Sequence, residues 1–239
     1  MSHTFEVEKR VFEALPQISI FLAVVRDIDL NQLDKDGIHN LFEESWSLAH
    51  KQISAYPNVQ SHPSILLWRK ASELLSISAK KYPSSVESMA KRTTKADSKP
   101  FSINPLVDFY NAFSLKYLLP FGGFDMASKA TKTLSLRFSR AGDKFMALNA
   151  DATVDIPCGE VLYASGNTVV TRHINWRQSK EGLIQETTTN ACFMAEVLHG
   201  YPEARLTDMK MDFKKCCVDL LNVEPELYMI DEANPSITY

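Results

Sequence analysis

The sequence predicts an α+β fold, with helices mainly in its N-terminal part and strands mainly in its C-terminal part. Apolar residues recur at helical spacing in several segments before residue 120. After Lys129 the pattern changes to an alternation of period two, and the helical and strand-like segments do not alternate as they do in βαβ units. No linker or internal repeat interrupts the 239 residues, so we expect a single domain over residues 1–239.

The predicted helices follow an apolar run of strand length at residues 18–27. Ser84 and Ser85 can cap a short helix, Asn104 is a suitable N-cap followed by Pro105 at a first helical position, and Pro120 ends the helix that Asn104 begins. Helices are expected from residue 36 to before Pro57, from 61–63 to 75, over 86–92, over 105–119 and over 206–221.

The strand-like segments are separated by short turns at Gly142, at 155–157 and at 165–167. Strands are expected over residues 134–138, 144–148, 159–163, 168–176 and 183–194.

The composition excludes several classes of protein. Net charge is −3, so the chain as a whole is not a nucleic-acid-coating protein, and a local basic patch stays possible. Residues 1–15 are charged and lack the apolar core of a signal peptide, and the apolar run 18–25 is too short to cross a bilayer. We therefore expect a cytoplasmic protein without a membrane partner. Cys158, Cys192, Cys216 and Cys217 have no metal-ligand spacing and are expected to be buried thiols.

The segment 104–125 carries the clearest indication of a pocket. Its helix places Asn111 and Ser114 among apolar residues and runs into a predicted turn, Phe121–Phe124, whose Gly122 and Gly123 leave backbone N–H groups unshielded. A tight turn that needs glycine for steric reasons, and polar side chains that satisfy neighbouring backbone groups, are the ordinary alternatives.

The run RHINWRQ (172–178) repeats the pattern on a predicted strand. Alternation directs His173, Asn175 and Arg177 to one face, which is expensive to bury and so faces solvent, a polar cleft or an anionic ligand. His173 can also be considered as a general base. A further polar cluster at 187–190 includes Thr189 and Asn190, for which cross-strand hydroxyl pairing is the alternative.

Basic residues gather in the first half of this acidic chain. Lys91, Arg92, Lys95 and Lys99 are the candidate phosphate contacts, although a helix face kept soluble explains them equally well. No phosphate-binding loop, nucleophile elbow or zinc-ligand spacing is present, so neither a metal nor another cofactor is expected.

The runs NPLVDFYNAFSLKYLLPFGGFD (104–125), GEVLYA (159–164), NWRQ (175–178) and TTNACFMAEVL (188–198) together resemble the free-standing B-three/B-four proteins. These are similar to the editing module of the phenylalanine–tRNA ligase beta subunit. The likeness covers approximately residues 62–198 and implies mixed β-sheets flanked by helices.

The resemblance implies binding of the aminoacylated 3′ end of tRNA and hydrolysis of wrongly attached tyrosine. Asn111 matches the family's pocket asparagine, and Asp125 closes the motif. Gly122 stands where the ligase module has a histidine and Gly123 where it has an alanine. The acidic residue that reads the tyrosine hydroxyl falls near Met194 or Glu196.

Three functions are therefore weighed. The first is a trans-acting aminoacyl-tRNA deacylase that uses placed water, backbone donors and the terminal ribose hydroxyl, without metal. The second is an RNA-binding protein that has lost hydrolysis, as Gly122 indicates. The third is a binding protein for a free amino acid or related metabolite, as the acidic net charge indicates.

Overall fold

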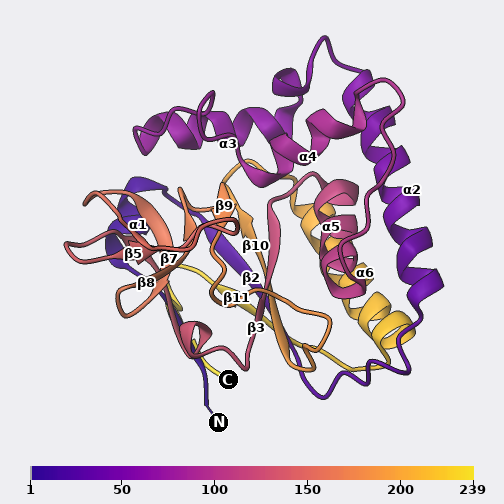
Figure 1. Cartoon of the computed structure of the whole chain (residues 1–239). Coiled ribbons are helices and arrows are strands. Elements are labelled where there is room, and N and C mark those ends of the chain that lie inside the picture. Colours follow the sequence, from indigo (N-terminus) through magenta and orange to yellow (C-terminus); the bar gives the residue numbers. More distant parts are fainter. Residues whose placement is uncertain (1) are drawn as a thin grey trace.

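The computed structural model describes residues 2–239 and confirms the α+β class, with two β-sheets flanked by helices (Figure 1). The large sheet has the strand order β12-β1-β4-β7-β8-β5-β6, with β9 paired to β8, and the small sheet has the order β11-β2-β10-β3. The strands of the large sheet are β12 (Ser236–Thr238), β1 (Thr4–Val7), β4 (Thr133–Phe138), β7 (Val161–Ser165), β8 (Thr168–Arg172), β5 (Lys144–Phe145), β6 (Val154–Asp155) and β9 (Arg177–Gln178). Those of the small sheet are β11 (Glu226–Ile230), β2 (Ser19–Val25), β10 (Ala191–Val197) and β3 (Phe121–Asp125).

The helices form two groups around the sheets. In Figure 1, α2, α5 and α6 lie together on one side of the small sheet, while α3 and α4 cross the top of the molecule. The predicted caps are confirmed, because the side chains of Ser84 and Asn104 accept from the backbone N–H groups of Glu87 and Val107. The helices are α1 (Lys9–Ala14), α2 (Lys35–Ser54), α3 (Pro63–Leu74), α4 (Ser85–Thr93), α5 (Pro105–Tyr117) and α6 (Glu203–Leu221), with 3₁₀ turns at Val59–Ser61 and Lys129–Thr131.

The small sheet is the middle layer of the molecule, with apolar side chains packed on both of its faces. All seven residues of β10 are buried. Phe193 packs with Phe109 of α5 and Phe213 of α6 on one face, with ring centroids 5.4–5.9 Å apart. Met194 belongs instead to the core shared with Tyr163 of the large sheet. The edge strand β3 therefore lies where helices and both sheets come close together.

Two segments predicted from local pattern are wrong. The double glycine of 121–124 is not a turn but part of strand β3, because pairing with β10 outweighs the weak strand propensity of glycine. The predicted strand 168–176 ends at Arg172, since His173 and Ile174 adopt positive φ angles of 46° and 59°. His173, Asn175 and Arg177 are consequently not a row on one strand face.

The remaining differences lie at the strand ends and at the chain ends. Residues 183–190 form turns, and β10 begins only at Ala191. The strands β1, β11 and β12 and helix α1 were not predicted. The first and last of these strands pair with each other, Thr4 with Thr238 and Phe5 with Ile237, while β1 also runs parallel to β4.

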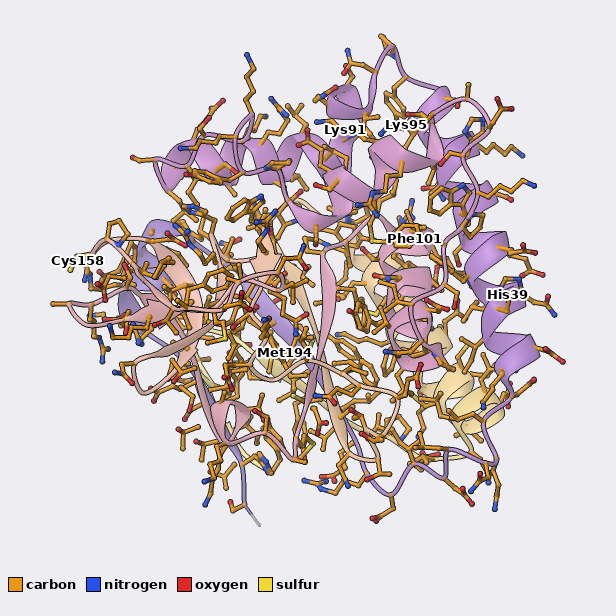
Figure 2. All side chains as sticks on the ribbon, in the orientation of Figure 1. His39, Lys91, Lys95, Phe101, Cys158 and Met194 are labelled. Carbon is orange, nitrogen blue, oxygen red and sulfur yellow. The ribbon has the colours of Figure 1, made fainter. Side chains whose placement is uncertain are left out.

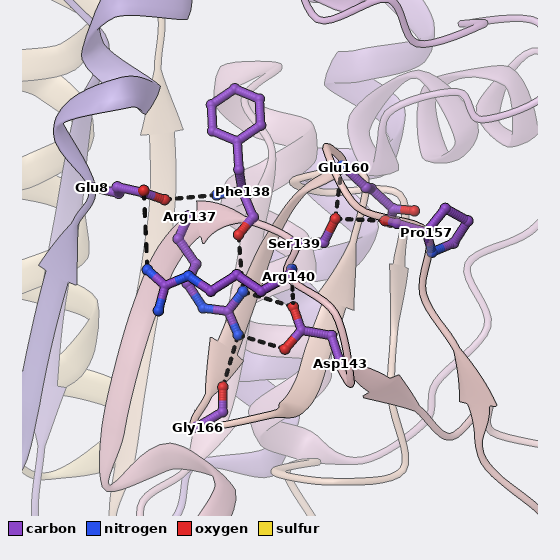
Figure 3. Close-up of polar contacts among 9 residues, drawn as sticks. All are labelled: Glu8, Arg137, Phe138, Ser139, Arg140, Asp143, Pro157, Glu160 and Gly166. Carbon is purple, nitrogen blue, oxygen red and sulfur yellow. Dashed lines mark hydrogen bonds and ion pairs between the residues drawn. The ribbon is translucent and has the colours of Figure 1, made fainter.

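A buried ion pair fixes the turn after β4 (Figure 3). The guanidinium of Arg137 donates two hydrogen bonds to the Asp143 carboxylate, at 2.7 and 2.8 Å, and one to the carbonyl of Gly166. The N–H of Arg140 also donates to this carboxylate, at 2.7 Å. Burial raises the pKa of Asp143, but these hydrogen bonds and charges outweigh it and hold the pKa below the ordinary value. The pair is therefore ionised and fully hydrogen-bonded inside the protein.

The four cysteines are free thiols in different surroundings. Cys192 and Cys217 are buried as expected, Cys216 is half-buried, and Cys158 is exposed because it lies in the turn after β6. Among residues 2–239, none of the helices has the length and apolar character needed to cross a membrane.

Candidate functional site

A cavity of about 160 Å³ lies between the edge of the small sheet and the large sheet. The strand β3 and the end of β10 form one wall, β7, β8 and the turn 174–178 form the opposite wall, and α4 and α5 close it from above. Its lining combines aromatic and aliphatic side chains with a few convergent polar groups, as ligand pockets do. The polar and charged groups are Ser85, Asn111, Tyr163, Thr171, Asn175, Arg177, Gln178 and Glu196.

The most unusual group in this cavity is the carboxyl of Glu196. Its side chain is only 6% exposed, and it accepts hydrogen bonds from Tyr163 Oη at 2.7 Å and from Asn175 Nδ2 at 3.4 Å. Burial raises the pKa of Glu196 to about 7, although both hydrogen bonds act in the opposite direction. A carboxyl group with this pKa can both accept and donate a proton near neutral pH.

The edge strand β3 presents backbone donors and open space. Asp125 N–H donates to Gly182 and the Gly123 carbonyl accepts from Gln178 Nε2 at 3.0 Å, so these residues direct their backbone groups away from β10. Backbone groups of successive residues alternate in direction along an antiparallel ladder. The N–H of Gly123 therefore points to the side of β3 that faces away from β10, and the N–H of Gly122 points toward β10. A Cβ atom built on Gly122 meets nothing within 4 Å, whereas one on Gly123 comes within 2.6 Å of Ile184. Gly122 thus keeps part of the cavity open, and Gly123 allows close packing on the helix side.

The turn after β8 brings Asn175 into the cavity. The backbone carbonyl of Asn175 accepts from Ser85 N–H at the start of α4, at 3.0 Å. Trp176 N–H donates to Arg172, also at 3.0 Å, and Gln178 reaches across to β3. The turn is thereby fixed to α4, to β8 and to the edge strand at once.

Five of the predicted site residues line this one cavity. Asn111 from α5 and Asn175 from the turn both line it, and the Asn111 amide makes no hydrogen bond among residues 2–239, so it is free to hold a ligand. The other three are Gly122, Gly123 and Arg177. The cavity therefore joins the two segments that the sequence singled out.

Ser114 and Asp125 do not line the cavity. Ser114 is fully buried and donates through Oγ to the carbonyl of Leu119 at 2.6 Å, which satisfies the end of α5. Asp125 accepts from Ala127 N–H and from Thr188 Oγ1, at 2.7 and 2.8 Å, and so organises the turn after β3.

His173, Thr189 and Asn190 also lie outside the cavity. Thr189 is exposed, and Asn190 accepts from Asp27 N–H at 3.2 Å, near the start of β10 rather than its end. The His173 ring packs against Tyr82 with centroids 3.9 Å apart. Burial lowers the pKa of His173, against the opposing effect of a nearby carboxylate. His173 and Asn190 thus make their contacts with neighbouring segments outside the cavity.

The predicted phosphate contacts do not line the cavity. Figure 2 places Lys91 and Lys95 at the upper edge of the molecule, whereas Met194 lies in its centre. The ammonium of Lys91 is 2.6 Å from the buried Glu87 carboxylate, and Arg92 lies over the ring of Phe101 at 4.7 Å. Lys95 and Lys99 are exposed on the loop after α4.

Several residues that line the cavity were not among the predicted site residues. Met194 and Glu196 face the same side of β10, and the carboxyl in the cavity is that of Glu196. Tyr163 and Trp176 lay within the predicted strands 159–163 and 168–176 and were not singled out as site residues. The family resemblance placed an acidic pocket residue near Met194 or Glu196, and the ionisable side chain of Glu196 within an otherwise apolar strand is a second signal for the same residue.

The fold and cavity together define an α+β protein with a small polar pocket beside a sheet edge. The chain belongs to the B3/4 domain family, whose model matches residues 67–222, and this confirms the resemblance found in the motifs. The match begins near the predicted start at residue 62 and extends past Leu198 to the end of α6.

A similar solved structure is an N-terminal fragment of the phenylalanyl-tRNA synthetase beta subunit from Pyrococcus horikoshii. The two share 9% sequence identity with a TM-score of 0.44, over 95% of this chain and 53% of that one. The chain thus spans about half the length of that fragment. No curated protein matches the chain.

Proposed function

We propose that this protein binds tRNA and hydrolyses the ester bond of mischarged aminoacyl-tRNA in trans. The tRNA part rests on the B3/4 family and on motifs that resemble the editing module of phenylalanine–tRNA ligase. The hydrolytic part rests on one observation, the buried Glu196 carboxyl with a pKa near 7 in a cavity that also holds free backbone and amide donors.

The size of the cavity agrees with an aminoacyl group as the ligand. A volume of about 160 Å³ is close to that of an engineered apolar cavity that holds one benzene molecule. An amino acid with a side chain of that size enters, whereas a nucleotide stays at the mouth. The apolar part of the lining, including Ile174 and Met194, favours a largely apolar side chain.

Hydrolysis requires a water, a proton acceptor and donors for the oxyanion. Glu196 in its ionised form takes a proton as water attacks the ester carbonyl carbon. The tetrahedral oxyanion accepts from the N–H of Gly123 and from the amide of Asn111. Collapse then breaks the bond to the ribose oxygen, which takes the proton from Glu196, and the amino acid leaves.

The test is the release of radiolabelled amino acid from a panel of mischarged tRNAs. We expect release from at least one pair and a loss of about 10²- to 10⁴-fold in kcat for Glu196→Gln, the range for a general acid–base group. Glu232→Gln changes an exposed carboxylate that makes no ion pair among residues 2–239, so it should leave the rate unchanged. Asn111→Ala should lower the rate through loss of a single donor.

Two results contradict the proposal. One is the absence of release from every mischarged tRNA, and binding of the same tRNAs would then identify a non-catalytic RNA-binding protein. The other is a Glu196→Gln variant as active as the unmodified protein, which would remove the carboxyl from the chemistry.

A further inference from the structure

We propose that Lys81, Tyr82, Trp176 and Arg177 form a stacking platform for the unpaired 3′-terminal nucleotide of an RNA, at the mouth of the cavity. We call these four residues the mouth platform. This inference rests on the RNA-binding part of the proposed function and does not depend on hydrolysis.

The mouth platform consists of aromatic rings held beside the cavity opening. Trp176 is half-buried and lines the cavity, as does the exposed Arg177. The ring of Tyr82 lies 4.7 Å from that of Trp176, at an interplanar angle of 71°. Cations lie over both rings: Arg177 Cζ and Arg172 Cζ are 4.9 and 5.7 Å from the Trp176 centroid, and Lys81 Nζ is 5.0 Å from that of Tyr82.

The backbone beneath these rings is fixed in advance. His173 packs on Tyr82 at 3.9 Å and occupies a left-handed conformation that turns the chain sharply after β8. The carbonyl of Asn175 is bonded to α4, as described above. Trp176 therefore needs little ordering when a ligand binds, which lowers the entropic cost of binding.

The two cations of the mouth platform are not neutralised. Among residues 2–239, neither Arg177 nor Lys81 has a carboxylate within 4.0 Å. Neighbouring basic residues differ in this respect, since Arg172 is bound to Glu160 and Lys91 to Glu87. Uncompensated positive charge beside the cavity attracts phosphate.

Aromatic faces and a cation at one site match the chemistry of an unpaired nucleotide. Proteins hold single-stranded RNA by stacking bases on aromatic side chains or on guanidinium planes, with basic residues on the backbone. A base within a duplex is stacked on neighbouring bases through both of its faces, so it has no free face that could stack on Trp176. Because Trp176 and Arg177 also line the cavity, a nucleotide on the mouth platform places its ribose at the opening, where an esterified group can enter.

Tryptophan fluorescence gives a direct test with uncharged tRNA. Trp46 and Trp68 are only 5% and 4% exposed, so a fluorescence change on binding reports Trp176. We expect intact uncharged tRNA to quench the fluorescence, and the same tRNA trimmed of its unpaired 3′ nucleotides to quench it much less.

The variants separate stacking from charge. Trp176→Ala should weaken binding of intact tRNA by roughly 5- to 150-fold, the range for one base stacked on an aromatic ring, and Trp176→Phe should restore most of it. Arg177→Ala should reduce the slope of log affinity against log salt by about one. Lys35→Ala is the control, because Lys35 is an exposed lysine without an ion pair at the start of α2. Unchanged thermal unfolding confirms that the variants are folded.

The proposal is overturned if Trp176→Ala binds intact tRNA as well as the unmodified protein. It is also overturned if the variant loses the same affinity for trimmed tRNA, because Trp176 would then contact another part of the RNA. Since the tRNA is uncharged, a protein that stacks the terminus but releases no amino acid refutes only the hydrolysis.

Discussion

The buried carboxyl of Glu196 makes the free energy of unfolding depend on pH. Its pKa is about 7 in the folded protein against an ordinary value of 4.5. One unit corresponds to about 1.4 kcal/mol, so full ionisation of this group costs the folded state on the order of 3 kcal/mol. The contribution to stability is fully present below pH 4.5 and is lost as pH rises through 7. Glu196→Gln keeps an oxygen that accepts from Tyr163 but cannot ionise.

Urea denaturation of both proteins at pH 5, 6, 7 and 8 measures this effect. We expect the difference in unfolding free energy between Glu196→Gln and the unmodified protein to shift in favour of the variant as pH rises, by about 2–3 kcal/mol in total. Other titrating groups contribute equally to the unfolding free energy of both proteins, so their contributions cancel in the difference. Parallel pH profiles would refute the argument, since they would mean that Glu196 has an ordinary pKa and reaches water in the folded state.

Three further predictions concern packing, charge and thiol access. Gly122→Ala places a methyl group in open space and should preserve or slightly raise the melting temperature while slowing deacylation, whereas Gly123→Ala meets a side chain at 2.6 Å and should lower the melting temperature. Asp143→Asn leaves the Arg137 charge buried without its partner and should cost about 3–5 kcal/mol at pH 7 by chemical denaturation. Because the Asp143 pKa is lowered, this difference should shrink as the pH falls below 4. A thiol reagent should label Cys158 first in the native protein, as peptide mapping will show, because Cys158 is the one fully exposed thiol of the four.

The sequence predicted best those elements whose signals are local. The dipeptide Asn104-Pro105 predicts the start of helix α5, and the structure has Asn104 as its N-cap and Pro105 as its first residue. The amphipathic spacing of its residues extends to the double-glycine segment. Asn111 could be placed in a pocket because an amide on such a helix has few local partners. These signals act within one or two turns of a helix and do not depend on the rest of the fold.

The sequence failed where tertiary pairing decides the structure. The glycines of β3 favour a turn, and only the ladder with β10 makes them a strand. The alternation expected over 168–176 is interrupted at His173, whose left-handed conformation has no local signature. Since β10 is buried on both faces, it shows no alternation that would have assigned Glu196 to the cavity.

The pairing of β1 with β12 has a consequence for folding. The outer side of β1 is covered only when residues 4–6 pair with residues 236–238, which lie more than 200 positions away in the sequence. The outer side of β1 therefore stays exposed in any folding intermediate in which residues 236–238 have not yet paired with it. Substitutions that break the pairing of β12 would make β1 the edge of the large sheet and expose its backbone N–H and C=O groups to intermolecular pairing.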